Sequence, residues 1–286
     1  MNGMKKGALS FAVALLAVLF ALMLPGCGSS GLSGTLRISG STTVLPLAQE
    51  AADQMMEKNK DLNITVQGGG SSVGITQVAE GTVEIGNASR DLKPEEENLG
   101  LVDHKIALDI IVAVVNPKTV KVDNLSMDQL KGIFLGTYTD WSQVGGEAGA
   151  IKVMIRDEAS GTREMFDEKV LGKTKENPVK PVSGAEEANS NGVMRQKVAS
   201  TDNAIGYLSK GYVDSSVKEL KLDGVESTTQ NAVSKNYKLS RYLHMFTKGE
   251  ATELAKAYID FVLSGDFQSA TVAEEYIPIK ETEPNR

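Results

Sequence analysis

The chain has 286 residues, 30 Lys and Arg against 37 Asp and Glu, a formal net charge of −7, one cysteine and two histidines. The acidic balance argues against nucleic acid as a partner. A single cysteine excludes a disulfide framework and a cysteine-cluster metal site. The length is sufficient for two α/β lobes with separate cores.

The N-terminus is typical of a secretory signal. Lys5 and Lys6 precede an apolar run over residues 8–24, which is shorter than the roughly 20 residues of a spanning helix. Leu24-Pro25-Gly26-Cys27 resembles the bacterial lipobox, in which the cysteine is lipidated and becomes the mature N-terminus. A buried free thiol is the alternative for a lone cysteine, but this position beside a Gly/Ser-rich stretch favours lipidation.

The sequence thus predicts a signal peptide over residues 1–26 and a lipidated Cys27 with a flexible tether over residues 27–34. Removal of the signal takes two lysines with it and changes the net charge from −7 to −9. An anion site on so acidic a protein must work locally, through aimed dipoles and few charges.

Strand, loop and helix recur from residue 35 onward. Apolar periodicity predicts strands at 36–39, 62–67 and 83–86, with helices at 47–56 and around 75–79 between them. This pattern predicts a mostly parallel sheet with helices on its faces. Ligands of such sheets bind beyond the carboxyl ends of the strands.

The second half begins after a buried strand at 106–115, which Pro117 ends. We expect helices at 130–134, 165–170, 192–199 and 252–263, and strands at 151–155 and 204–208. In the last helix the inward residues should be Leu254, Ala257, Tyr258 and Phe261. We assign lobe 1 to residues 35–116 plus 238–286 and lobe 2 to 117–237, joined near Asn116 and at 238–244.

Three loops are rich in Ser, Thr and Gly, and each precedes a helix: residues 40–43, 70–72 and 159–162. Helix N-termini with hydroxyls and glycines can bind an anion without a lysine. The alternative for each loop alone is ordinary N-capping. Arg156 and Arg163 flank the third loop, and Glu158 is close enough to hold Arg156 in place or to form a surface pair with it.

Five segments appear in a specific order: Ile38–Pro46, Gly70–Ile75, Ile85–Leu92, Arg156–Arg163 and Ala204–Tyr207. Together they resemble the phosphate-binding protein family of the bacterial and archaeal phosphate ABC importer. The resemblance covers nearly the whole mature chain. It implies a two-lobe α/β fold of the periplasmic-binding-protein type (type II), with mixed sheets, flanking helices and a hinge of two crossing strands.

The resemblance also implies ligand roles for the three polar loops. The candidate phosphate-binding residues are Ser41, Thr42, Thr43, Ser71, Ser72, Ser89, Arg90, Arg156, Ser160, Gly161 and Thr162. Glu158 matches the acid that braces the arginine. Well-known members place an aspartate after the third strand to accept the proton of hydrogen phosphate, whereas this chain has Ser89-Arg90-Asp91, the pattern of a related branch. Asp91 or another carboxylate is then the candidate for that role. The segment Asn189-Ser190-Asn191-Gly192, with Asn189 and Ser190 as its candidate residues, is expected to close the pocket or to form an ordinary turn.

The resemblance implies capture rather than catalysis, without cofactor or metal. The expected partners are inorganic phosphate, permease subunits with a separate ATPase, and the membrane through Cys27, with the chain a monomer outside the cytoplasm. A receptor for sulfate, molybdate or tungstate, and a phosphate sensor, are alternatives. Gly70-Ser71-Ser72-Val73-Gly74 also fits the nucleophile-elbow pattern of serine hydrolases, but the only possible bases, His104 and His244, lie among apolar residues.

Overall fold

A mixed sheet of 10 strands runs through this computed structural model, which describes residues 31–282. Its main path has the order β2-β1-β3-β11-β4-β8-β6-β7, and β9 and β12 each pair with β4. The strands are β1 (Gly34–Gly40), β2 (Leu62–Gly68), β3 (Ile85–Ala88), β4 (Leu101–Val115), β6 (Lys152–Arg156), β7 (Glu186–Ala188), β8 (Ala204–Ser209), β9 (Lys218–Glu219), β11 (Ser240–Lys248) and β12 (Ile277–Pro278). β5 (Asn124–Leu125) and β10 (Lys221–Leu222) form a separate pair. The mixed α/β fold class is therefore confirmed.

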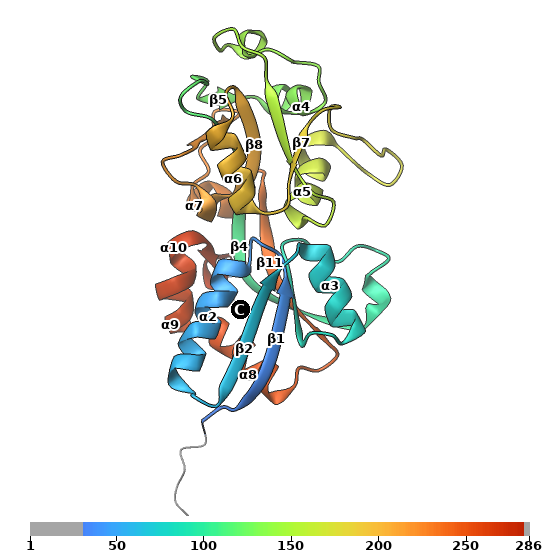
Figure 1. Cartoon of the computed structure of the whole chain (residues 1–286), viewed down its shortest axis with the longest axis vertical. Helices are drawn as coiled ribbons and strands as arrows, with labels where there is room; N and C mark the ends of the chain where they lie inside the picture. The colour runs from blue at the N-terminus through green and yellow to red at the C-terminus, as the bar shows by residue number, and fades with distance from the viewer. Residues whose placement is uncertain (1–30, 283–286) are drawn as a thin grey trace, which may run out of the picture. The chain divides into compact units, whose positions relative to one another are not determined.

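The first strands are parallel, and helices connect them. β1 pairs with β2 and β3 in parallel, with α2 (Leu45–Lys58) and α3 (Ser71–Glu80) as crossovers, and Figure 1 shows both helices beside these strands. Pro46 falls in the first turn of α2, where its missing N–H costs nothing. One face of α2 is buried, and it includes Leu47, Ala51 and Met55, as its periodicity predicts.

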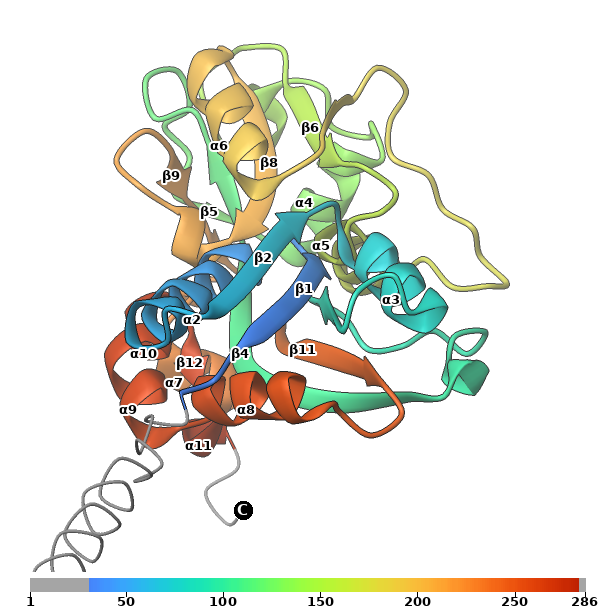
Figure 2. The same ribbon diagram turned by 60° about the horizontal axis from the view of Figure 1, so that its bottom comes forward.

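The sheet has two parts, with β1, β2 and β3 on one side of β4 and β11 and with β6, β7 and β8 on the other. β4 and β11 connect these two parts. β4 pairs antiparallel with β11 over residues 101–110 and with β8 over residues 111–115, and Figure 2 shows β4 running beside β11. The strand is longer than the predicted 106–115 because its polar start, Leu101–Lys105, is held by this pairing.

The second part of the sheet repeats the strand–helix pattern. β6 pairs in parallel with β7 and β8. The helices here are α4 (Met127–Phe134), α5 (Gly161–Phe166), a π-helical turn η3 (Asp167–Leu171), α6 (Asn191–Ser200) and α7 (Thr229–Val233). Short 3₁₀ turns lie at Glu97–Leu99, Trp141–Val144 and Lys210–Tyr212. A capping box at Ser126 begins α4, since Ser126 and Gln129 each bond the other's backbone N–H.

The last helices return to the first part of the sheet. They are α8 (Glu253–Val262), α9 (Gly265–Phe267), the π-helical turn η5 (Gln268–Val272), α10 (Ala273–Glu275) and α11 (Ile279–Thr282). Of the residues predicted to face inward from α8, Tyr258 is buried, and Leu254 and Phe261 are partly buried and pack against the hydrophobic core. The other buried residues are Ala255, Ile259 and Val262, so the centre of the buried face lies about one residue from the predicted position.

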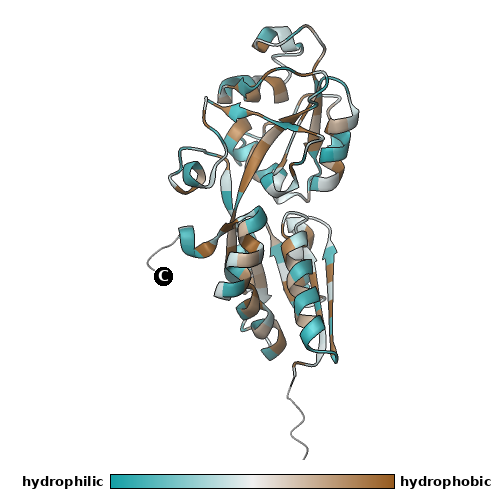
Figure 3. Cartoon of the chain, turned by 90° about the vertical axis from the view of Figure 1, so that its left-hand side faces the viewer, coloured by the Kyte–Doolittle hydropathy of each residue, from teal (hydrophilic) through white to brown (hydrophobic). Residues whose placement is uncertain are grey.

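Two large hydrophobic clusters fill the fold. The first contains Leu36, Ile38, Ala107 and Tyr258, and the second contains Leu108, Phe134, Phe166 and Tyr207, among others. Figure 3 shows the apolar strands between helices with polar outer faces. Along β4, Ala107 belongs to the first hydrophobic cluster and Leu108 to the second. The predicted lobe boundaries remain a prediction, and the change of core lies earlier on this strand than Asn116.

Between residues 31 and 282 no helix combines the length and apolar character of a membrane span. The predicted signal over residues 1–26, and residues 27–30 of the tether with Cys27, lie outside the described residues.

Candidate functional site

Polar loops gather where β1, β2 and β3 end. The loop after β1 begins at Gly40, whose φ of +132° favours glycine, and an added Cβ would lie 2.1 Å from the Asn87 carbonyl oxygen. Gly70 N donates to Gly40 O over 3.0 Å, which joins the second loop to the first. The parallel order of these strands therefore brings the predicted loops together.

The first and third loops meet through two threonine hydroxyls. Thr43 Oγ1 and Thr162 Oγ1 are 3.3 Å apart, and both residues are buried. Tyr276 Oη donates to Thr43 O and Tyr212 Oη donates to Thr42 O, at 2.7 and 2.6 Å. These two tyrosines, which the sequence did not suggest, fix the backbone of the first loop.

The second loop meets the third at Gly161. Ser89 N donates to Ser71 Oγ over 3.0 Å, and the two hydroxyls are 3.3 Å apart. A Cβ on Gly161 would lie 2.4 Å from Ser71 Oγ and 3.0 Å from Ser89 Oγ. Ser72 N also donates to the Ala159 carbonyl over 3.2 Å. The loops are thus packed too closely for any side chain at position 161.

The contacts between the three loops form a polar cluster that contains Thr42, Thr43, Ser71, Ser89 and Thr162. Arg156 belongs to this cluster and is only 1% exposed. Its Nε donates to Ala188 O at 3.1 Å, Nη1 to Asn191 Oδ1 at 3.2 Å and Nη2 to Thr42 Oγ1 at 3.2 Å. Burial lowers the pKa of Arg156 to about 10, so the guanidinium stays charged at neutral pH. It is a buried cation and not half of a surface pair.

Glu158 does not brace this arginine. Glu158 is exposed, and the backbone carbonyls of Ala188 and Asn189 orient Arg156 together with Asn191. The expected bracing fails because the strand ends at Arg156 and the chain turns outward before Glu158. Carbonyl oxygens supply the acceptors that the carboxylate was expected to supply.

Asn191 is the member of its segment that reaches the cluster. Its Nδ2 donates to Thr43 Oγ1 at 3.0 Å and to Thr42 Oγ1 at 3.4 Å. Asn189 has an exposed side chain, and Ser190 caps α6 by accepting from Val193 N at 3.1 Å. The predicted segment contains Asn191, but residue types alone did not single it out from its neighbours.

Arg241 and Asp109 are further members that the sequence analysis missed. Arg241 Nη2 donates to Thr162 Oγ1 at 2.7 Å and to Thr43 Oγ1 at 3.2 Å. Asp109 Oδ2 lies 3.1 Å from the same nitrogen. The available signal was Asp109 itself, the one charged residue in the apolar run 106–115, because a buried charge requires a partner.

The hydrogen bonds of the cluster leave hydroxyl protons free to donate. Thr42 Oγ1 and Thr43 Oγ1 each accept two N–H bonds, from Arg156, Asn191 or Arg241. A hydroxyl has two lone pairs and one proton. Because both lone pairs of Thr43 Oγ1 are occupied, its proton goes to Thr162 Oγ1, and the protons of Thr42 and Thr162 are available to an additional acceptor. Such a cluster of donors and cations suits an anion.

Several predicted serines have local structural roles. Ser41 Oγ accepts from Thr43 N at 3.2 Å, and Ser160 Oγ accepts from Arg163 N at 3.2 Å as the N-cap of α5. Ser72 Oγ accepts from Arg90 Nη2 at 3.3 Å. The capping alternative thus describes Ser160, although its hydroxyl proton is still a donor.

Arg90 and Asp91 lie apart from the threonine hydroxyls. Arg90 Nη1 and Nη2 bond the two Glu96 carboxylate oxygens at 2.6 and 2.8 Å, which uses most of the guanidinium. The side chain of Asp91 is 88% exposed and lies 3.6 Å from His244 Nε2. Their predicted ligand and proton-acceptor roles are therefore not supported by where they lie.

Arg90 instead contributes to a contact between the two parts of the sheet. Glu164 Oε2, on α5, lies 3.0 Å from Arg90 Nε and 3.2 Å from Lys93 Nζ. The Arg90 contact lacks hydrogen-bond alignment and is an ion pair. It connects the segment after β3 to the helix that follows the third loop.

Replacing Glu164 by Gln should weaken anion binding roughly two- to fivefold, because partly exposed ion pairs contribute little. The matched control is Glu168→Gln, which removes the same charge from an exposed pair with Lys169. Titration calorimetry of both variants checks this. A loss above tenfold for Glu164→Gln would place this residue in the binding cluster itself.

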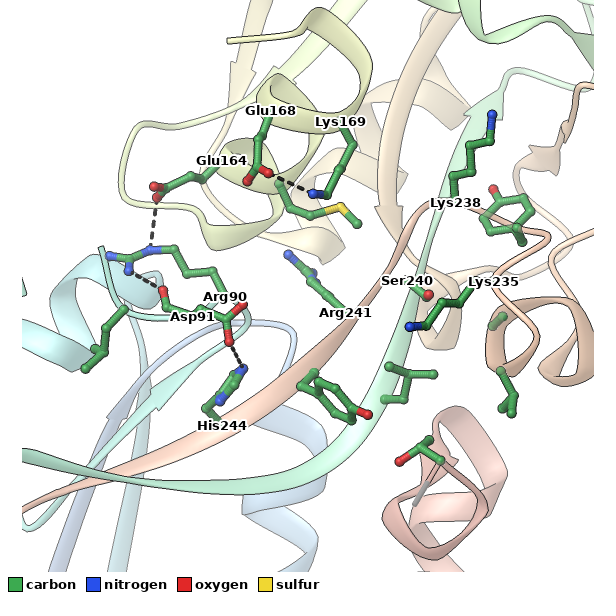
Figure 4. A pocket seen from close by; sticks show the side chains of 18 of the residues that line it. Arg90, Asp91, Glu164, Glu168, Lys169, Lys235, Lys238, Ser240, Arg241 and His244 are labelled. Carbon is green, nitrogen blue, oxygen red and sulfur yellow. Dashed lines mark hydrogen bonds and ion pairs between the residues drawn. The ribbon is translucent and has the colours of Figure 1, made fainter. Parts of the chain in front are cut away.

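A groove of about 760 Å³ opens beside the cluster. Figure 4 shows its lining, in which the Arg90, Lys169, Lys235, Lys238 and Arg241 side chains lie with Glu164, Glu168 and Asp91. Arg241 belongs both to this groove and to the cluster, whereas Arg156 and the threonines are covered by the contacts between the loops.

The two histidines are held in structural contacts. His244 Nδ1 lies 2.8 Å from Asp103 Oδ1 and its ring stacks on Phe246, while His104 Nε2 lies 3.2 Å from Thr247 Oγ1. Ser71 contacts Ser89 rather than either ring. Residues 31–282 contain no group of three or more His, Cys, Asp or Glu arranged to hold a metal ion.

Comparison with known proteins gives consistent matches. A family model described as a PBP superfamily domain matches residues 27–266. The phosphate-binding protein PstS of Bacillus subtilis is 37% identical over 99% of this chain and 98% of its own length. A Clostridium perfringens putative phosphate ABC transporter substrate-binding protein, solved with bound phosphate, superposes with a TM-score of 0.81 at 39% identity, over 86% of this chain and all of that one.

A phosphate transport receptor from Vibrio cholerae superposes with a TM-score of 0.70 at 33% identity, over 85% of this chain and 99% of that one. These relatives match in sequence and in fold over nearly their whole lengths. The chain therefore belongs to the PBP superfamily and, within it, to the family of phosphate-binding proteins named PstS.

Proposed function

We propose that this protein captures inorganic phosphate and delivers it to the permease of an ABC importer with a separate ATPase subunit. The observation that carries the proposal is the buried cluster in which Arg156, Arg241 and Asn191 donate to the hydroxyls of Thr42, Thr43 and Thr162. The relatives named above bind phosphate or act in its transport according to their names, which supports the same ligand.

The proposed ligand set draws on both parts of the sheet. It comprises Thr42, Thr43, Ser71, Arg156, Ser160, Gly161, Thr162 and Asn191. Micromolar binding corresponds to about −8 kcal/mol, and hydrogen bonds to a charged group contribute roughly 1.5–3 kcal/mol each. Several donors are therefore needed to exceed the entropy and desolvation costs, and loops from two lobes supply them.

Closure of two lobes is part of this proposal. Lobe 1 would be residues 35–116 plus 238–286 and lobe 2 residues 117–237, with β4 and β11 as crossing strands. The division of the hydrophobic residues into two clusters, and the contact between Thr43 and Thr162, support it. The proposed role is capture without catalysis. Ser71 contacts Ser89, whereas His104 and His244 contact Thr247 and Asp103, so these contacts do not support a serine hydrolase.

Titration calorimetry of the compact unit Ser33–Arg286 with phosphate, sulfate and molybdate near pH 7 tests the proposal. We expect one phosphate per chain, bound far more tightly than either other anion. Stronger binding of sulfate or molybdate would mean that the protein is a receptor for another oxyanion and not for phosphate. If none of the three anions binds, the Ser/Thr/Gly-rich loops serve only as helix caps and turns.

We further propose that the protein is extracytoplasmic and anchored through a lipid on Cys27. The support is the sequence Leu24-Pro25-Gly26-Cys27 after an apolar run. Cys27→Ser should move the protein from the membrane fraction to the soluble fraction, because the one anchor is lost. Fractionation with Ser29→Ala as the control checks this, and retention of the Cys27→Ser protein in the membrane would contradict the anchor.

A further inference from the structure

We propose that Arg241, positioned by Asp109, is a second anion-binding arginine that acts from the strands joining the two parts of the sheet. The inference rests on the proposed function, because it concerns the same anion. Arg241 lies on β11 and Asp109 on β4, so this pair sits outside all three polar loops. It adds to the site a cation that does not depend on the loops for its position.

The contacts of Arg241 place it at the junction of the first and third loops. Its Nη2 bonds Thr162 at 2.7 Å and Thr43 at 3.2 Å, and these hydroxyls are themselves 3.3 Å apart. One nitrogen therefore touches a loop from each part of the sheet. A charge in this position favours the arrangement in which both loops are together around an anion.

The remaining nitrogen of the guanidinium is an uncompensated donor. Arg241 is 7% exposed, and its Nη1 is buried without a hydrogen-bond partner among the described residues. Buried charged donors left unpaired are costly and rare in native proteins. In Figure 4 the Arg241 side chain extends from β11 into the groove. An anion between the loops is the partner that would satisfy this donor.

Asp109 determines the direction of that guanidinium. Asp109 Oδ2 accepts from Arg241 Nε at 3.2 Å and from Nη2 at 3.1 Å, while Oδ1 accepts from Ser209 Oγ at 2.5 Å. This two-point contact fixes the plane of the guanidinium. Because Nε and Nη2 face the carboxylate, Nη1 is the nitrogen left to face a ligand.

The charges of the buried group also favour an anion. Burial raises the pKa of Asp109 and lowers the pKa of Arg241, and the opposite charge of each partner counteracts the effect of burial. Arg156 and Arg241 against Asp109 leave one excess positive charge in a buried site. Its electrostatic cost falls when a phosphate anion enters.

The test uses a matched pair of variants, because Arg241→Met alone would leave Asp109 as an unpaired buried charge and could unfold the protein. Asp109→Asn/Arg241→Met removes both charges at similar volume. Asp109→Asn/Arg241→Lys restores only the cation. Thermal unfolding without phosphate establishes that each variant folds, and titration calorimetry with inorganic phosphate gives its affinity.

We expect the methionine double variant to bind phosphate about 10- to 150-fold more weakly than the unaltered protein, the range for one charge-assisted contact. The lysine double variant should bind at least about fivefold more tightly than the methionine one, because it keeps a cation. A purely structural role predicts equal affinities for the two double variants. Equal affinities, or a methionine variant within threefold of the unaltered protein, would overturn the inference.

The outcome is distinguishable from failure of the proposed function. If the unaltered protein binds no phosphate, the proposed function itself is wrong. Suppose instead that the unaltered protein binds phosphate and that Arg156→Ala weakens binding at least about 100-fold. If the methionine double variant then binds as tightly as the unaltered protein, only the role of Arg241 is wrong.

Discussion

Replacing Arg156 by alanine is expected to weaken phosphate binding at least about 100-fold, because it removes a charge-assisted donor and the support of two neighbours. Arg156 is 1% exposed and holds both Thr42 and Asn191. Its loss would leave Asn191 Oδ1 without that donor and Thr42 Oγ1 with only its longer bond from Asn191 Nδ2, at 3.4 Å. Titration calorimetry with phosphate measures the effect.

The control for this variant is Arg37→Ala. Arg37 lies on β1 with a half-exposed side chain, and its Nη2 is 2.6 Å from Glu84 Oε1. Its replacement removes the same side chain and charge but should leave phosphate affinity unchanged, since this surface pair lies outside the polar loops and exposed pairs contribute little even to stability. An Arg156→Ala protein that folds and binds phosphate as well as the Arg37→Ala protein would mean that the anion binds elsewhere.

A second large effect is expected from the smallest substitution, Gly161→Ala. The added Cβ would lie 2.4 Å from Ser71 Oγ, well inside van der Waals contact, so the second and third loops must separate. A displacement of this kind lengthens several donor–anion bonds at once. We expect phosphate affinity to fall more than about tenfold, and the unfolding temperature to fall as well, because the added methyl strains a closely packed contact.

Gly192→Ala is the matched control for that substitution. Gly192 lies in α6, next to Asn191, and an added Cβ there would meet nothing within 4 Å. Alanine in a helix stabilises by up to about 1 kcal/mol relative to glycine, so this variant should bind phosphate normally and unfold slightly later. Normal phosphate affinity in the Gly161→Ala protein would contradict the close packing of the two loops around the anion.

Much of the fold was predictable because local patterns and tertiary packing agree. The alternation in β1 and β2 and the apolar face of α2 appear at the expected residues. Differences arose where pairing decides the outcome. β3 lies at Ile85–Ala88, later than the predicted 83–86, because its register with β1 aligns Ile85 with Ile38. The antiparallel insertion of β11 between β3 and β4 is also a long-range choice that no local pattern encodes.

The candidate site was predictable where a loop motif carries it and not where strands do. Thr42, Thr43, Arg156 and Thr162 were found from their loops, and the structure brings them together. Arg90 was misplaced because Glu96, six residues later, binds its guanidinium, and sequence alone does not reveal that pairing.

Asp109 and Arg241 were missed for a related reason. They lie far apart in sequence on β4 and β11, and neither belongs to a loop motif. Only the antiparallel register, which aligns Arg241 with Asp109, shows that they are partners.

A crystal structure of the Ser33–Arg286 unit with phosphate tests the central claim most directly. We predict a phosphate within hydrogen-bond distance of Arg156 and of the hydroxyls of Thr43 and Thr162, enclosed by the loops that follow β1, β2 and β6. A phosphate held instead in the open groove among Lys169, Lys235 and Lys238, with Arg156 untouched, would contradict the account.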